Sequence, residues 1–111
     1  MALMVVAILV QVYLAGLGLF GTDGFGTHED FGWMVHTLGM VAFVLAIIGP
    51  RTKVTMLGAL GLVVLNTVQI MLSEADAAGL AALHPTLALA VLGMAAWLVV
   101  VSGTRIEGAP R

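Results

Sequence analysis

The sequence has 111 residues, of which 61% are hydrophobic and only 9% are charged. A soluble domain of this length needs polar residues over most of its outer surface, and this composition does not supply them. The formal net charge is -2, and four Lys and Arg residues are too few for a basic surface that would bind nucleic acid. The composition therefore indicates an integral membrane protein, with the lipid bilayer as its first partner and no nucleic-acid partner.

Four apolar segments follow one another through short polar connections. Each holds about 18 to 20 residues, which at roughly 1.5 Å per residue matches a hydrocarbon core about 30 Å thick. Short connections make successive helices antiparallel neighbours. The sequence predicts a single all-α domain, residues 1–111, built as an up-down-up-down antiparallel bundle of four transmembrane helices. The predicted spans are residues 2–20, 31–48, 54–72 and 81–101.

The basic residues indicate the orientation of the bundle, since cytoplasmic loops collect Lys and Arg. Arg51, Lys53, Arg105 and Arg111 all fall at one end of the predicted bundle, and the connections at the other end are acidic. This pattern predicts a multi-pass protein of a cell inner membrane with both termini in the cytoplasm. The chain has no cysteine, which excludes disulfides and thiol chemistry.

The first and second spans each carry one stripe of small or polar residues at helical spacing. Such a stripe on a membrane helix usually faces a neighbouring helix and not lipid. The stripe of the first span contains Gln11, and the stripe of the second places His36 between two glycines. The two stripes consist of Ala7, Gln11, Ala15 and Gly18, and of Gly32, His36, Gly39, Phe43 and Ala46.

The third span carries two amides on its stripe, and the fourth opens on a histidine followed by Pro85. Proline is favoured in the first turn of a helix, so this pair predicts a helix start. Counted from the acidic connections, the polar side chains of the last three spans lie at one level, roughly 5 to 9 Å below the outer boundary. The two stripes are Thr55, Ala59, Leu62, Asn66, Gln69 and Ser73, and His84, Ala88, Val91 and Ala95.

The histidines on the inward stripes are candidate ligands of a cofactor. An ionisable residue inside a span is costly, which makes it a functional hypothesis by default. His36 and His84 would supply two axial imidazoles to a b-type haem, and Gly32 and Gly39 would leave room for its macrocycle. A protein of this kind serves electron transfer and need not be an enzyme on its own. The other predicted residues of the cofactor site are Gln11, Asn66 and Gln69.

Other interpretations stay open. The polar residues could hydrogen-bond between the helices of a cofactor-free accessory or assembly subunit, at roughly 0.6 to 2 kcal/mol each. The protein could instead bind or transport a metal or small ligand, with His28, Glu29, Asp30 and His84 as ligands of zinc or copper. His28 could also lie at a solvated helix start that Thr27 or His28 caps. A homo-oligomer or a larger membrane complex is compatible with each interpretation.

The chain also resembles a known group of proteins. The runs VQVYLAGLGLFG, HEDFGW and LHP resemble those of a family of small, uncharacterised four-helix bacterial membrane proteins, and the similarity covers most of the chain. The resemblance implies the fold and a bacterial inner membrane, and it favours a role for His28. It implies no reaction, because no activity is established for the family. The positions that carry it are Gln11, Ala15, Gly16, His28, Gly32, His84 and Pro85.

Overall fold

The computed structural model describes the backbone of residues 1–21, 24–49 and 52–107, and the side chains of these residues up to 103. All regular structure in these ranges is helical. Four helices are long and apolar enough to cross a membrane, so the chain is a multi-pass membrane protein by length and composition. The helices are α1 (Ala2–Phe20), α2 (Gly26–Ile48), α3 (Lys53–Ser73), the short α4 (Ala78–Ala81) and α5 (Leu83–Glu107).

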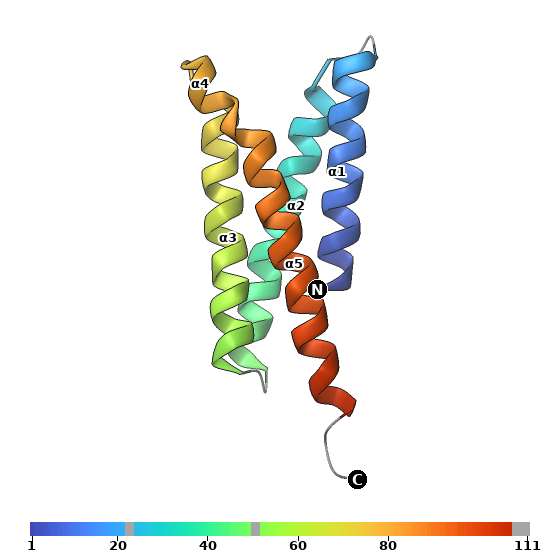
Figure 1. Ribbon diagram of the computed structural model, residues 1–111, viewed down its shortest axis with the longest axis vertical. Helices are drawn as coiled ribbons and strands as arrows, with labels where there is room; N and C mark the ends of the chain where they lie inside the picture. Colours follow the sequence, from blue (N-terminus) through green and yellow to red (C-terminus); the bar gives the residue numbers. More distant parts are fainter. Residues whose placement is uncertain (22–23, 50–51, 108–111) are drawn as a thin grey trace.

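The four long helices form a ring in which α1 contacts α2, α2 contacts α3, α3 contacts α5, and α5 contacts α1. In Figure 1 the adjoining ends of α1 and α2 lie at the same end of the molecule as α4, and this end is termed the α4 end. The adjoining ends of α2 and α3 lie at the opposite end, termed the α2–α3 end. The first turn of α2 and the first turn of α5 therefore both lie at the α4 end.

Two helix starts differ from the sequence prediction. α2 begins at Gly26 with Phe25 as its N-cap, so Thr27 and His28 lie in the first turn and neither caps the helix. The predicted cap was therefore wrong. The helix begins before the predicted span, because hydropathy locates the apolar core of a span, whereas a helix continues into polar sequence beyond the hydrocarbon. The fourth apolar segment is divided into α4 and α5, and Pro85 lies in the first turn of α5, as expected.

The buried core follows the stripes that the sequence predicts for the last two spans. Leu62 of α3 and Ala95 of α5 are at most 1% exposed, and Leu98 extends the same face of α5. Glycines let α3 and α5 approach closely, because a Cβ atom at Gly58 would lie 2.5 Å from Cδ2 of Leu98. Ser73, predicted to end the α3 stripe, is exposed and donates a hydrogen bond to the Ile70 carbonyl of its own helix.

The inward face of α2 is turned relative to the prediction. Its buried residues are Val35, Gly39 and Ala46, and His28 lies on the same line. Because an α-helix turns by about 100° per residue, His36 lies on the flank of this face. Gly39 does face its neighbours, as predicted: a Cβ atom there would lie 3.5 Å from Cε of Met4 and 3.9 Å from Cγ2 of Val63. These neighbours belong to α1 and α3, so Gly39 serves helix packing.

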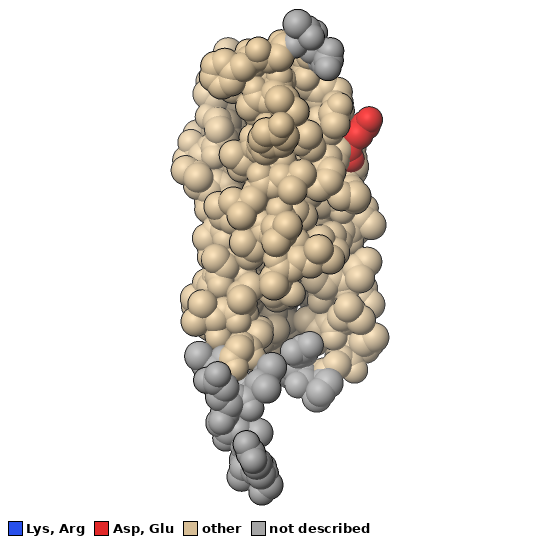
Figure 2. All heavy atoms as spheres, turned by 90° about the vertical axis from the view of Figure 1, so that its right-hand side faces the viewer, with Lys and Arg blue, Asp and Glu red and all other residues tan. Residues whose placement is uncertain are grey.

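The outer surface of the bundle is apolar, as contact with lipid requires. Figure 2 shows one face on which acidic atoms appear at one place near the edge and no Lys or Arg is visible among the described residues. Two exposed threonines satisfy their hydroxyl groups within their own helix. Thr37 donates to the Trp33 carbonyl at 2.9 Å, and Thr67 donates to the Val63 carbonyl at 2.8 Å. These hydroxyl protons are thus paired despite facing the apolar exterior.

Candidate functional site

Two histidines from different helices meet inside the α4 end of the bundle. His28 lies in the first turn of α2 and His84 in the first turn of α5. Their ring centroids are 6.0 Å apart, and the ring planes are inclined at 81°. Both side chains are partly buried. The contact is possible because the two helix starts lie at the same end and turn these residues toward the interior.

A backbone carbonyl holds each imidazole through Nδ1. His28 Nδ1 is 3.0 Å from the Gln11 carbonyl oxygen of α1, and His84 Nδ1 is 2.9 Å from the Gln69 carbonyl oxygen of α3. A carbonyl only accepts hydrogen bonds, so Nδ1 carries the proton and donates in both cases. In the neutral imidazole Nε2 then holds the lone pair, which can accept a hydrogen bond or bind a metal. The two Nε2 atoms are therefore the acceptor atoms of this pair.

The side-chain amide of Gln11 contacts His28 a second time. Gln11 Nε2 donates to the His28 carbonyl oxygen at 2.7 Å and lies 3.4 Å from His28 Nε2. Both partners accept hydrogen bonds, so the NH₂ group of the Gln11 amide points toward His28 and its Oε1 atom points away from it. Gly32 provides the space for the amide, because a Cβ atom at this position would lie 3.0 Å from Gln11 Nε2. Gln11 and Gly32 thus act together to position His28.

Three amide atoms at the same end are buried without a hydrogen-bond partner in the described part of the chain. They are Gln11 Oε1, Asn66 Nδ2 and Gln69 Oε1. Asn66 is 6% exposed and Gln69 is 9% exposed. A buried polar atom without a partner costs about 1 to 3 kcal/mol, and such atoms are rare in native proteins. This end of the bundle therefore has unused hydrogen-bonding capacity.

A cavity of about 320 Å³ lies among these polar groups. The five polar residues that line it come from all four long helices. The rest of the lining is apolar and includes the buried side chains of Ile8, Val35 and Val91. An apolar cavity with a few polar groups converging on it is the usual form of a small-molecule site. The polar lining consists of Gln11, His28, Asn66, Gln69 and His84.

Comparison with known protein families matches residues 11–78 to DUF6220, a family of unknown function. The chain belongs to the DUF6220 family. The matched segment contains Gln11, His28, Asn66 and Gln69 and ends before His84. Neither the curated proteins nor the solved structures provide a match to the chain.

The DUF6220 protein brings together most of the residues that the sequence assigned to one site, with His28 in place of His36. His36 is not among the residues that line the cavity, and its ring lies at 6.1 Å from the ring of Trp33. Its Nδ1 is buried without a partner in the described ranges. The interior line of α2 runs through His28, Val35 and Gly39, and a step of four residues back from Gly32 also reaches His28, so extending the predicted stripe by one turn would have identified it. Its place among the residues that carry the family resemblance was a second signal.

The predicted zinc or copper site is not formed by its four residues. No three His, Asp or Glu side chains within the described ranges lie close enough together to hold a metal ion. Glu29 and Asp30 are exposed on α2. Consecutive residues of a helix point in directions about 100° apart, so the two carboxylates cannot face the interior together with His28. Of the four predicted ligands, only His28 and His84 come together.

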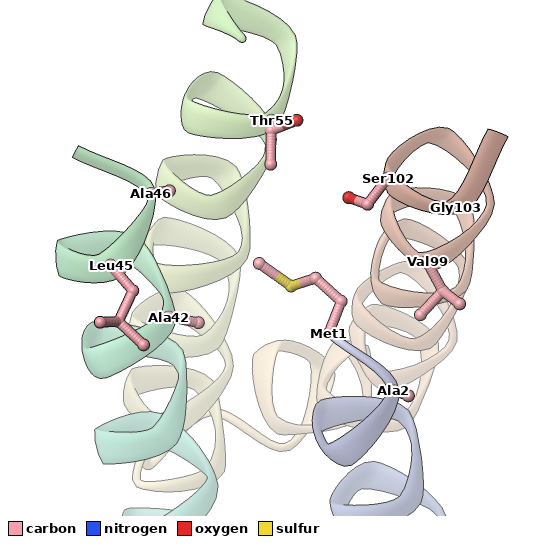
Figure 3. A pocket seen from close by; sticks show the side chains of 9 residues that line it. All are labelled: Met1, Ala2, Ala42, Leu45, Ala46, Thr55, Val99, Ser102 and Gly103. Atoms are coloured by element: carbon pink, nitrogen blue, oxygen red, sulfur yellow. The ribbon is translucent and has the colours of Figure 1, made fainter. Parts of the chain in front are cut away.

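A second cavity of about 270 Å³ lies at the α2–α3 end of the DUF6220 protein. Figure 3 shows the Met1 side chain extending into it, and Thr55 and Ser102 lie on opposite sides. Thr55 Oγ1 is 3.2 Å from Thr52 Oγ1, whereas Ser102 Oγ is buried with no partner among the described residues. The described lining of this cavity has no imidazole or carboxylate, so it offers less binding chemistry than the cavity at His28 and His84.

Proposed function

We propose that this DUF6220 protein binds a small molecule between His28 and His84. The observation that carries the proposal is the pair itself: two imidazoles from different helices, each held through Nδ1, with Nε2 of His84 left to bind. The cavity of about 320 Å³ that both histidines line supports it, because an apolar cavity with a few polar groups is the usual form of a small-molecule site. The cavity is built from one chain, so the site needs no second subunit.

We infer further that the helices run up-down-up-down across the inner membrane with both termini in the cytoplasm. Lys53 begins α3 at the α2–α3 end, whereas Glu74 and Asp76 follow α3 at the α4 end. Cytoplasmic ends of membrane helices collect basic residues, which supports a cytoplasmic location for the α2–α3 end. The paired histidines would then lie in the outer half of the bundle, near the outer surface of the membrane.

Single cysteines test this topology, because the chain has no cysteine of its own. We expect a membrane-impermeant maleimide to label Asp76→Cys in intact cells and to label Glu107→Cys only after the membrane is opened. Both variants should react equally in detergent, which controls for intrinsic accessibility. Labelling of residue 107 and not of residue 76 in intact cells would invert the topology and place the histidine pair on the cytoplasmic side.

The binding function is tested on protein purified from its own membranes in mild detergent. We expect one kind of small molecule to copurify at about one per chain, identified by the absorption spectrum of the protein and by mass spectrometry of an organic extract. A site of this volume with five polar groups should retain its ligand through purification in a lipid-like environment. Protein that carries no stoichiometric small molecule in nanodiscs of native lipid would contradict the proposal.

A b-type haem is the second candidate ligand, with His28 and not His36 opposite His84. Two imidazoles that bind one metal at about 2 Å from each nitrogen have ring centres roughly 6 Å apart, close to the spacing of this pair. Nδ1 bonded to a backbone carbonyl is also the usual support of a metal-binding histidine. Gln11 Nε2 lies 3.4 Å from His28 Nε2, so iron could bind there only after the amide moved. A Soret band would identify haem and favour electron transfer.

A further inference from the structure

His36 is the histidine that the candidate site leaves unused. It is partly buried on the flank of α2 and lines neither of the two cavities described above. Its ring lies nearly perpendicular to that of Trp33, at a centroid distance of 6.1 Å, and Trp33 is 56% exposed. The accessible part of the His36 imidazole therefore faces the outside of the bundle.

The two ring nitrogens of His36 differ in their surroundings. Nδ1 is enclosed by protein and has no hydrogen-bond partner in the described ranges. Nε2 is not enclosed, and it too has no partner in that part of the chain. A proton on Nδ1 would be a buried donor without an acceptor, so the neutral ring carries its proton on Nε2. His36 therefore presents one N–H donor to the exterior.

This donor lies in the middle of the apolar length of α2. His36 is ten residues after Gly26 and twelve residues before Ile48, which at about 1.5 Å per residue is roughly 15 to 18 Å from either end of the helix. Hydrocarbon chains at this depth contain no acceptor, and water and lipid head groups lie at the membrane surfaces. An acceptor for the Nε2 proton must therefore come from another molecule that spans the membrane.

The next residue of α2 carries an acceptor at the same depth. Thr37 is exposed, and its hydroxyl donates to the Trp33 carbonyl at 2.9 Å. A hydroxyl oxygen that donates its proton keeps lone pairs that accept. One donor and one acceptor thus lie on adjacent residues of the outer part of α2. This surface is therefore complementary to a copy of itself.

A line of large apolar side chains separates this donor from this acceptor. Trp33, Met40 and Ile47 recur every seven residues and are 56%, 42% and 54% exposed, and they are termed the α2 seam. His36 and Thr37 lie on opposite sides of the seam, because consecutive helical residues point about 100° apart. When two parallel helices meet along such a seam about a two-fold axis, each flank of one helix faces the opposite flank of the other. His36 of each copy then faces Thr37 of the other copy.

We propose that the protein forms a two-fold homodimer through the α2 seam. Nε2–H of each His36 donates to the Thr37 hydroxyl oxygen of the other copy, so two equivalent hydrogen bonds form within the hydrocarbon. Both copies cross the membrane in the same direction, which makes the two α2 helices parallel. The inference is independent of the proposed binding function, because the cavity at His28 and His84 is built from one chain.

Cross-linking of single cysteines in native membranes tests the position of the interface, because the chain has no cysteine of its own. We expect Met40→Cys to give a disulfide-linked dimer under mild oxidation, because residue 40 lies beside the two-fold axis. Val100→Cys is the matched control: Val100 is 62% exposed on α5, which contacts α1 and α3 and lies across the ring from α2. No cross-link at residue 40, or equal or stronger cross-linking at residue 100, would overturn the inference.

Substitutions that remove one partner of each hydrogen bond test the pairing. His36→Phe removes the donor and Thr37→Val removes the acceptor at similar volume. Each should weaken dimerisation in lipid at least fivefold, as measured by energy transfer between fluorescently labelled chains over a range of protein-to-lipid ratios. The double variant should be no weaker than either single variant, because both substitutions break the same two bonds.

Thermal unfolding of each variant separates loss of the dimer from loss of the fold, and Thr37→Val keeps the test decisive where His36→Phe fails to fold. Ligand retention at His28 and His84 should be unchanged in folded variants, so failure of the dimer leaves the binding function standing. Additive losses in the double variant, unchanged dimerisation in both folded single variants, or a protein that stays monomeric at every protein-to-lipid ratio would overturn the inference.

Discussion

His28→Ala and His84→Ala are each expected to lower retention of the copurifying ligand by tenfold to a hundredfold, whereas His36→Ala leaves it unchanged. Each substitution in the pair removes one of two imidazoles whose ring centroids lie 6.0 Å apart. Loss of one hydrogen bond to a buried ligand costs about 1 to 3 kcal/mol, which is roughly tenfold to a hundredfold in affinity. The readout is ligand per chain in protein purified in parallel.

His36→Ala is a close control, because it removes the same side chain from the same helix. His36 is also partly buried but does not line the cavity. All three variants should be compared by thermal unfolding, so that loss of ligand is separated from loss of fold. Loss of ligand in His36→Ala with full retention in His28→Ala would mean that His36 and His84 form the binding pair, and that His28 serves helix packing.

Gly32→Leu is expected to remove ligand binding by displacing Gln11. Even a Cβ atom at this position would lie 3.0 Å from Gln11 Nε2, and a leucine side chain would occupy the space that the amide uses. Gln11 would then lose its contacts of 2.7 Å to the His28 carbonyl oxygen and 3.4 Å to His28 Nε2. We expect affinity to fall more than tenfold, with a further loss of about 1 to 3 kcal/mol in unfolding free energy from overpacking.

Two variants calibrate this prediction. Gly26→Leu lies on the same helix, where a Cβ atom would meet nothing within 4 Å, and should leave both affinity and stability near those of the unsubstituted protein. Gly32→Ala should have an affinity and a stability between those of Gly32→Leu and Gly26→Leu, because the tip of the flexible Gln11 side chain can shift by a few tenths of an ångström. Ligand binding in Gly32→Leu equal to that of Gly26→Leu would show that Gln11 has no part in positioning His28.

The sequence by itself determined the class of protein and the position of its helices. Runs of apolar residues too long for a soluble helix surface identified four helices long and apolar enough to cross a membrane, because hydropathy is a property of local sequence. It also determined the inward faces of α3 and α5. On α3 the polar residues Thr55, Asn66 and Gln69 share one face, so only one rotation of the helix buries them together; Thr67, on another face, pairs its hydroxyl within the helix.

The sequence did not determine the rotation of α2 about its own axis; contacts in the tertiary structure did. From Leu38 on, small and apolar residues surround this helix on every side, so several rotations expose equally apolar surfaces to lipid, and composition cannot choose among them. Contacts with other helices decide the rotation: Gly39 lies against Met4 and Val63, and Gly32 accommodates the amide of Gln11. That rotation places His28 and not His36 on the interior line.

The apolar spans alone likewise did not determine which histidine ring meets His84. His28 lies in polar sequence that hydropathy assigned to a connection, yet α2 begins before it and carries it into the bundle. The two rings meet only because the α2 and α5 starts come together at one end, where carbonyl groups of α1 and α3 hold Nδ1 of each ring. Contacts among four helices far apart in sequence created this site, and no local pattern of residues encodes such a meeting.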